Sequence, residues 1–380
     1  MFQLSFWEKQ TYFSDTDVLV VGSGIVGLNA AISLKQKSPQ LKILVIDRGF
    51  LPYGASTRNA GFACFGSLSE VLDDLSRMSE TEVFDLLMRR WNGLKRLRSL
   101  LKDANIGYEG LGGFDVFTGA DEILFEQCCD KINWLNGKLH SITGETTIYK
   151  IADNKTSAFG FNGVEHLICN RFEGQIDTGK MMKSLVAKAR EMGIEIMNGM
   201  EINKFEEHEN EITIHTQQGF NFKTKNLLVT TNGFAQQLLP QLDVIPARAQ
   251  VMITEPIENL KIKGTFHYDK GYYYFRNVGN RLLFGGGRNL NFEGENTMEF
   301  GLTEQVQNKL DTLLQEMILP NTTYKIEQRW SGIMGLGKVK TTIIKPISKN
   351  IFCAVRMGGM GIAIGSLVGE EAAEMIINRS

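Results

Sequence analysis

The segment from Asp17 to Asp47 constrains the fold of this chain more than any other. An apolar run, Asp17–Val21, leads into Gly22–Gly27, which has the spacing Gly-x-Gly-x-x-Gly, and a helical run follows. A second apolar run, Lys42–Ile46, ends at the carboxylate of Asp47. A strand, a glycine-rich turn, a helix and a second strand with an acidic end are together typical of a dinucleotide-binding unit, whereas the glycine motif alone would be weak evidence.

Each glycine of this unit has a separate physical role. Gly22 permits the tight turn out of the strand, Gly24 lets the backbone approach a pyrophosphate because it has no Cβ, and Gly27 lets the helix lie close to the strand. The free N–H groups at the helix N-terminus favour the anionic pyrophosphate. Asp47 follows Gly22 by 25 residues, which suits an acceptor of ribose hydroxyls, and its charge would repel the 2′-phosphate of NADP.

The composition is that of an ordinary globular protein with a net charge close to zero. Of 380 residues, 43% are hydrophobic and 22% are charged, and the net charge is −2. This balance argues against a nucleic-acid partner. No run reaches the roughly 18 apolar residues that a transmembrane helix needs, and residues 1–13 lack the apolar core of a signal peptide. We therefore expect a cytoplasmic protein with no transmembrane segment.

The cysteines predict neither disulfides nor a metal site. Their number is odd and their spacing fits no metal motif; they are Cys64, Cys128, Cys129, Cys169 and Cys353. We expect free, mostly buried thiols in a reducing compartment.

Beyond Gly61 the pattern alternates between helices and short strands. Helical periodicity covers 68–78, 83–101, 121–136, 177–192, 303–317 and 361–378. Strand patterns cover 194–197, 211–216, 220–223, 225–231 and 350–355, and the segment 244–284 predicts several antiparallel strands. No repeat or low-complexity linker divides the chain, so we expect a mixed α/β fold in which two domains interleave.

Four blocks of sequence follow one another along nearly the whole chain. They are the dinucleotide unit with Gly54–Gly61, then Leu227–Phe234 with Pro246–Gln250, then Tyr274–Arg276 with Arg281–Gly286, and finally Arg329–Gly332 with Gly358–Gly361. In this order they resemble the FAD-dependent oxidoreductases of the D-amino-acid oxidase and glycine oxidase (DAO) superfamily. The nearest likeness is to the γ-glutamylputrescine oxidase-type branch.

The resemblance implies two interleaved domains. A Rossmann-like FAD-binding domain would combine 1–66, 164–234 and 330–380, and a substrate-binding domain would combine 67–163 and 235–329. The substrate domain would carry an antiparallel sheet that faces the flavin, with helices on its other side. FAD would be bound non-covalently, because 335–337 offers no cysteine or histidine for attachment.

The resemblance also assigns the contacts to FAD. The residues are Gly22, Gly24, Ile25, Val26, Gly27, Asp47, Arg48, Ala55, Ser56, Arg58, Asn59, Ala60, Gly61, Ile202, Thr231, Asn232, Gly233, Arg356, Met357, Gly358, Gly359, Met360, Gly361 and Ile362. The helix that begins near Gly361 would direct its N-terminus at the N1 and C2=O edge of the flavin, where reduction places negative charge. Arg356 stands where relatives often have glycine, and it would either add a cation near the flavin or substrate or simply face the solvent.

The substrate side is defined less well by the sequence. Tyr272, Tyr274 and Arg276 are the candidates for lining the pocket, and the alternative is plain aromatic packing of a strand, because only one face of a strand points inward.

A substrate carboxylate has no obvious partner in the sequence. Several relatives that oxidise amino acids carry an arginine shortly after the Trp-x-Gly unit, where it would clamp the carboxylate. Here Ile333–Gly335 contains none, which puts a free α-amino acid substrate in doubt, and Lys338, Lys340 and Arg288 are the possible replacements.

The resemblance implies oxidation of a C–N bond. A hydride would pass from a carbon that bears an amine to flavin N5, and water would hydrolyse the resulting imine. The substrate would be a small amine or amino-acid derivative, with oxygen or another acceptor reoxidising the flavin. Two alternatives stay open: a flavin dehydrogenase that acts on a C–O bond, such as that of a 2-hydroxy acid, and a flavoprotein subunit that passes electrons to a partner.

Overall fold

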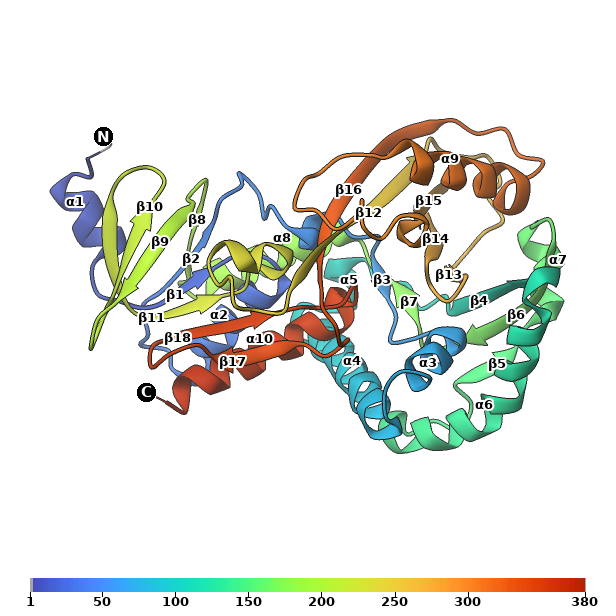
Figure 1. The fold of residues 1–380 in the computed structure, drawn as a ribbon, viewed down its shortest axis with the longest axis horizontal. Coiled ribbons are helices and arrows are strands. Elements are labelled where there is room, and N and C mark those ends of the chain that lie inside the picture. Colours follow the sequence, from blue (N-terminus) through green and yellow to red (C-terminus); the bar gives the residue numbers. More distant parts are fainter. Residues whose placement is uncertain (1–2, 380) are drawn as a thin grey trace.

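The chain forms two lobes, each built on an eight-stranded sheet (Figure 1). The structure is a computed structural model and describes residues 3–379, so residues 1, 2 and 380 of the predicted FAD-binding domain lie outside it. Both ends of the described chain lie on the lobe that holds β1, β2 and β11. A short α1 (Phe6–Glu8) precedes the first sheet.

The first sheet is the predicted dinucleotide-binding sheet. Its order is β17-β18-β11-β1-β2-β8, with parallel pairing throughout except at the edge strand β17. The strands are β1 (Thr16–Val21), β2 (Ile43–Asp47), β8 (Glu195–Asn198), β11 (Asn221–Val229), β17 (Ile343–Pro346) and β18 (Ile351–Val355), and β9 (Ile202–Glu207) and β10 (Ile212–Thr216) extend the sheet from β11. The central segments 18–21, 43–46 and 227–229 are continuously apolar and buried because helices and loops cover both faces of the sheet there.

Glycines set the spacing of the helices around this sheet. The helices are α2 (Ile25–Lys37), α8 (Thr178–Glu191), α10 (Gly361–Ile377) and, from the second lobe, α4 (Glu80–Leu101). A Cβ on Gly369 of α10 would lie 2.7 Å from the backbone nitrogen of Ala30 in α2, and a Cβ on Gly93 of α4 would lie 2.1 Å from the carbonyl oxygen of Ala363 in α10. These close approaches hold the N-termini of α2 and α10 in fixed positions.

The second sheet is mostly antiparallel, in the order β16-β12-β15-β14-β13-β4-β6-β5. Its strands are β4 (Gly113–Thr118), β5 (Tyr149–Ile151), β6 (Val164–Asn170), β12 (Ile245–Thr254), β13 (Thr265–Tyr268), β14 (Tyr273–Val278), β15 (Arg281–Gly286) and β16 (Ile326–Leu336). A small pair, β3 (Phe62–Ala63) and β7 (Gly174–Gln175), lies between the lobes. The remaining helices are α3 (Leu68–Leu75), α5 (Asp103–Ile106), α6 (Glu122–Thr143), α7 (Thr156–Phe159) and α9 (Glu304–Leu313).

Side-chain alternation gives the second sheet two different faces. Phe266 of β13 and Phe275 of β14 stack with ring centroids 4.8 Å apart inside an apolar core. Their strand neighbours His267 and Tyr274 pair in register and therefore point to the opposite face. That face borders the cavity described below.

The structure differs from the sequence predictions at four places. The predicted strands 220–223 and 225–231 form the single strand β11, because Thr224 pairs with both neighbouring strands and continues the ladder. The helix predicted at 121–136 runs to Thr143, where Gly144 ends it in the left-handed conformation. The pairing of β13 with β4 is parallel, whereas an antiparallel sheet was predicted.

The predicted domain boundaries at 164 and 330 leave β6 and the second half of β16 in the FAD-binding domain, yet both belong to the second sheet.

Among the described residues, no helix is long and apolar enough to cross a membrane.

Candidate functional site

A cavity of about 840 Å³ lies between the two lobes, and it is lined by residues from both sheets. This volume is within the range of small-molecule and cofactor sites. Most of the residues predicted to contact FAD line it; they are Gly22, Gly24, Ile25, Val26, Asp47, Arg48, Ala55, Ser56, Arg58, Asn59, Ala60, Gly61, Ile202, Thr231, Asn232, Met357, Gly358, Gly359, Met360, Gly361 and Ile362. Gly27, Gly233 and Arg356 do not.

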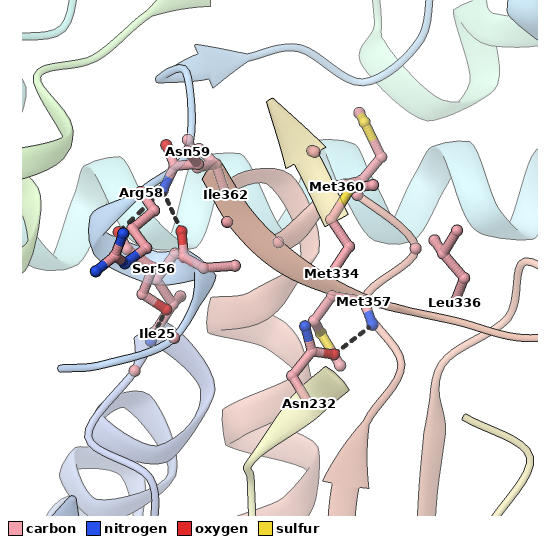
Figure 2. A pocket seen from close by; sticks show the side chains of 18 of the residues that line it. Ile25, Ser56, Arg58, Asn59, Asn232, Met334, Leu336, Met357, Met360 and Ile362 are labelled. Carbon is pink, nitrogen blue, oxygen red and sulfur yellow. Dashed lines mark hydrogen bonds between the residues drawn. The ribbon is translucent and has the colours of Figure 1, made fainter. Parts of the chain in front are cut away.

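The N-terminus of α2 opens into the cavity. Its N-cap is Gly24, which has no side chain to cap the first turn, so N–H groups of that turn are available to an anion. The Ser56 hydroxyl oxygen accepts a hydrogen bond from the Ile25 N–H at 2.9 Å, which joins loop 54–61 to the helix (Figure 2). A Cβ on Gly27 would lie 1.9 Å from the Gly22 carbonyl oxygen. This glycine therefore allows α2 to pack closely against the turn, and it does not line the cavity.

Asp47 already has a dense set of partners. One carboxylate oxygen accepts hydrogen bonds from the backbone and hydroxyl of Ser23, each at 3.0 Å, and the other accepts from the N–H groups of Gly49 and Tyr53. The side chain therefore organises the turn that follows β2 as well as bordering the cavity. Whether it also accepts from a ribose stays a prediction.

The adenosine side of the predicted site contains two unusual polar groups. The Arg48 guanidinium lies between the rings of Tyr53 and Phe234, at 4.6 and 4.1 Å from their centroids. The Thr231 hydroxyl is buried, lines the cavity and has no hydrogen-bond partner in the described structure. A buried hydroxyl without a hydrogen-bond partner, facing the cavity, is suited to bind a polar ligand such as FAD.

Asn232 connects this side to the C-terminal glycine block. Its side-chain oxygen accepts a hydrogen bond from the N–H group of Met357 at 3.2 Å (Figure 2) and another from the N–H group of Arg356 at 3.1 Å. Gly358 and Gly359 follow in the left-handed conformation, with φ of 60° and 81°. They turn the chain so that the N-terminus of α10, capped only by Met360 without a side-chain hydrogen bond, also opens into the cavity.

Arg356 points away from the cavity. Its Nη1 pairs with the Asp243 carboxylate at 2.8 Å and its Nε donates to the Thr341 carbonyl at 2.7 Å. Its φ is 66°, in the region that glycine adopts without strain. The side chain is only 6% exposed, so the predicted solvent-facing role is wrong, and it does not line the cavity in which the flavin is expected.

Replacing Arg356 with glycine should therefore leave the flavin unaffected. The buried side chain donates to Asp243 and Thr341, and relief of the positive φ offsets only part of that loss, so we expect the free energy of unfolding to fall by about 2 kcal/mol. The flavin midpoint potential and FAD affinity should match those of the unmodified protein. A clear fall in that potential would instead show that Arg356 stabilises the reduced flavin.

Tyr272 and Tyr274 line the cavity and Arg276 does not. Burial raises the pKa of Tyr274 to about 12, so this phenol stays protonated at ordinary pH. The Arg276 guanidinium is buried against backbone carbonyls: it donates to Ala60, to Ile176 at 3.0 Å and to Asn277 at 3.1 Å. Burial lowers its pKa to about 10. The prediction that Arg276 lines the substrate pocket is thus corrected: the strand directs it toward loop 54–61, which it holds in place.

Three groups were possible replacements for the missing carboxylate clamp. Met334 lines the cavity at the point where relatives carry the carboxylate-binding arginine (Figure 2). Lys338 does not line the cavity, and Lys340 lines it but forms an ion pair with Asp74. Arg288 lines the cavity, and its Nε is buried without a hydrogen-bond partner in the described structure.

The cavity wall also contains an ionisable group of residues that the sequence analysis missed. Glu70, His267 and Cys64 line it, and the carboxylate of Glu173 lies directly behind them. Burial raises the pKa of the Glu173 carboxyl. A hairpin between 265–268 and 273–278 pairs His267 with Tyr274. Had the sequence been aligned as this hairpin, it would have predicted His267 on the cavity side of the sheet together with Tyr274.

The comparisons with known proteins agree with this geometry. A region of the bifunctional protein ThiO/ThiG from Synechocystis sp. is 24% identical over 245 residues, which are 62% of this chain and 33% of that protein, so this chain spans about a third of that relative's length. The fold matches L-proline dehydrogenase from P. horikoshii, with a TM-score of 0.75, 18% identity and coverage of 96% and 94% of the two chains. It also matches iminodiacetate oxidase from Chelativorans sp. BNC1, with a TM-score of 0.75, 15% identity and coverage of 95% of each chain.

A match to a whole family also covers nearly the whole chain. The DAO family, described as FAD dependent oxidoreductase, matches residues 17–375. The dinucleotide unit, the two helix N-termini and the substrate-side sheet all fall inside that range. This chain therefore belongs to the DAO family of FAD-dependent oxidoreductases, as its sequence motifs predict.

Proposed function

We propose that this protein oxidises the C–N bond of a small amine or amino-acid derivative. The observation that carries the proposal is the convergence of two helix N-termini, those of α2 and α10, on one cavity whose other wall carries Tyr272 and Tyr274. The first terminus suits a pyrophosphate and the second suits the negative charge of a reduced flavin. The structures of similar fold include proteins named for oxidation of proline and of iminodiacetate, which supports a C–N bond as the target.

Bound FAD would supply a two-electron acceptor for a hydride from the carbon that bears the amine. The substrate nitrogen lone pair would form the C=N bond as that hydride leaves, and water would then release the carbonyl product. The residues of the chain have to orient the C–H bond and exclude bulk water. Tyr274, half-buried and uncharged, can donate one hydrogen bond to the substrate or act as an apolar wall.

The direct test is anaerobic reduction of the flavin by candidate substrates. We expect amines or N-substituted amino acids to bleach the flavin absorbance and 2-hydroxy acids to leave it unchanged. Bleaching by hydroxy acids alone would establish the C–O alternative. Bleaching by no small molecule, together with a stably co-purifying protein, would establish the electron-transferring subunit.

Arg288 is our proposed partner for a substrate carboxylate. Its Nε is buried without a partner, its Nη2 donates to Asn296 at 2.9 Å, and the guanidinium lies 4.8 Å from the centroid of Phe292. Desolvation of this group would strengthen a hydrogen bond to a carboxylate. Arg288 follows β15, and in this proposal it takes the carboxylate-binding role of the arginine that relatives carry near the position of Met334 in β16.

Replacing Arg288 with alanine should lower kcat/KM for a carboxylate-bearing amine by about 10- to 100-fold, the loss typical of one charge-assisted hydrogen bond. Most of the change should appear in KM, and an analogue without the carboxylate should be affected little. Lys338→Ala is the matched control, because Lys338 is a cation near the site that does not line the cavity. Equal losses with both substrates would contradict this role.

Three finer points stay proposals. The γ-glutamylputrescine oxidase-type branch rests on the sequence blocks alone. Oxygen and another electron acceptor are equally compatible with the cavity, and a cytoplasmic location rests on the composition of the chain.

A further inference from the structure

At the cavity wall, three side chains of different chemistry meet in one buried cluster. They are Cys64, Glu173 and His267, and their donor atoms all lie within 4.8 Å of one another. The residues are 1%, 1% and 6% exposed. Nothing in the oxidation proposed above uses this cluster.

Two polar atoms of the cluster make no hydrogen bond in the described structure. The Nε2 of His267 and the Oε2 of Glu173 are both buried and lie 3.7 Å apart, within ion-pair distance but beyond a hydrogen bond. Buried polar atoms are nearly always satisfied, so two that face each other at this distance suit a ligand shared between them. Ligand atoms around a tetrahedral zinc ion lie about 3.3 to 3.8 Å apart, given bond lengths of about 2.0 to 2.3 Å.

Each of the three side chains is also oriented by a second group. The Nδ1 of His267 lies 3.4 Å from Oε2 of Glu70, the arrangement in which a metal-bound histidine donates its other N–H to a carboxylate. The Oε1 of Glu173 accepts hydrogen bonds from the N–H groups of Phe65 and Gly66, at 3.0 and 2.9 Å, so that Oε2 is the oxygen that faces His267. The Cys64 sulfur lies 3.4 Å from the Thr265 hydroxyl, which can donate to a thiolate.

We propose that Cys64, Glu173 and His267 form a binding site for one Zn²⁺ ion. A thiolate, a carboxylate and a neutral imidazole suit this metal, and the two negative charges balance the ion inside the protein. Cys64 and His267 also line the cavity, so a fourth coordination position facing the cavity would take water or a substrate atom. The inference does not depend on the proposed C–N oxidation.

A second group of possible metal ligands is neither buried nor free of other partners. Glu122, Glu165 and His166 are partly or fully exposed, and the Nδ1 of His166 already pairs with Asp153 at 2.8 Å. We therefore assign no site there.

The test is metal content and affinity of the FAD-loaded protein. After dialysis against Zn²⁺ in a chelator buffer, elemental analysis should give one zinc per chain. Cys64→Ser should lower the affinity for zinc at least 100-fold, whereas Cys353→Ser, which removes another fully buried thiol from the core of the first lobe, should leave it unchanged. Glu70→Gln should weaken binding by about 10- to 100-fold, because Glu70 orients His267 without being a ligand; its amide oxygen can still accept from Ser67 in the capping box of α3.

Cobalt provides a readout that does not require the variants to fold. Co²⁺ bound to the unmodified protein through a thiolate in tetrahedral geometry should give absorption bands at longer wavelength than the flavin. The proposal is overturned if the unmodified protein takes up no stoichiometric zinc, if Co²⁺ gives only an octahedral spectrum, or if a folded Cys64→Ser protein binds zinc as tightly as before.

Discussion

Replacing Gly27 with valine should give a protein that binds FAD at least about 100-fold more weakly, with a free energy of unfolding lowered by about 3 kcal/mol or more. The reason is steric. A Cβ at this position would lie 1.9 Å from the Gly22 carbonyl oxygen and 2.7 Å from the Thr230 hydroxyl. The helix would have to move away from β1, and its N-terminus would move with it.

The matched control is Gly137→Ala. Gly137 lies within α6, and a Cβ there would meet no atom within 4 Å. Alanine should stabilise that helix by about 0.5 to 1 kcal/mol and leave FAD binding unchanged. Denaturant unfolding of the apoprotein and FAD titration by fluorescence measure both quantities. Tight FAD binding by Gly27→Val would mean that the turn after β1 does not hold the pyrophosphate.

Replacing Arg276 with methionine should have the second largest effect, a loss of about 3 kcal/mol of unfolding free energy. The buried guanidinium donates to the carbonyls of Ala60, Ile176 and Asn277, and methionine would leave all three without this donor. Since Ala60 belongs to loop 54–61, FAD should also dissociate faster. If Arg276 contacted substrate instead, KM would rise while stability and FAD release stayed normal.

Arg171→Met is the comparison for this change. Arg171 pairs with Glu145 at 2.9 Å on the surface, where both side chains are largely exposed. Such pairs contribute about 0 to 1 kcal/mol. A loss for Arg276→Met no larger than the loss for Arg171→Met would contradict the structural role assigned here.

The sequence predicted the first sheet well because its signals are local. Gly22–Gly27 requires a strand before it and a helix after it, and the structure has β1 and α2 at those places. The glycines before α10 likewise require a turn, and Gly358 and Gly359 adopt positive φ there. Local backbone requirements of this kind can be recognised without knowing the tertiary fold.

The substrate side was less predictable because its residues meet only through tertiary packing. The strand pattern of β14 could not show that Arg276 reaches loop 54–61, more than 200 residues earlier in the chain. Arg356 is similar, since its partner Asp243 is distant in sequence and its positive φ is not visible in the residue type. Cys64, Glu173 and His267 come from three separate segments, so no sequence spacing could reveal them as a cluster.

The central claim is that FAD binds between the N-termini of α2 and α10 and is reduced there by an amine. The most direct measurement is the visible spectrum of the FAD-loaded protein during anaerobic titration with amines. We predict one FAD per chain, released by acid precipitation, and complete bleaching by at least one amine or amino-acid derivative. A folded protein that neither contains FAD nor takes it up on titration would contradict this account.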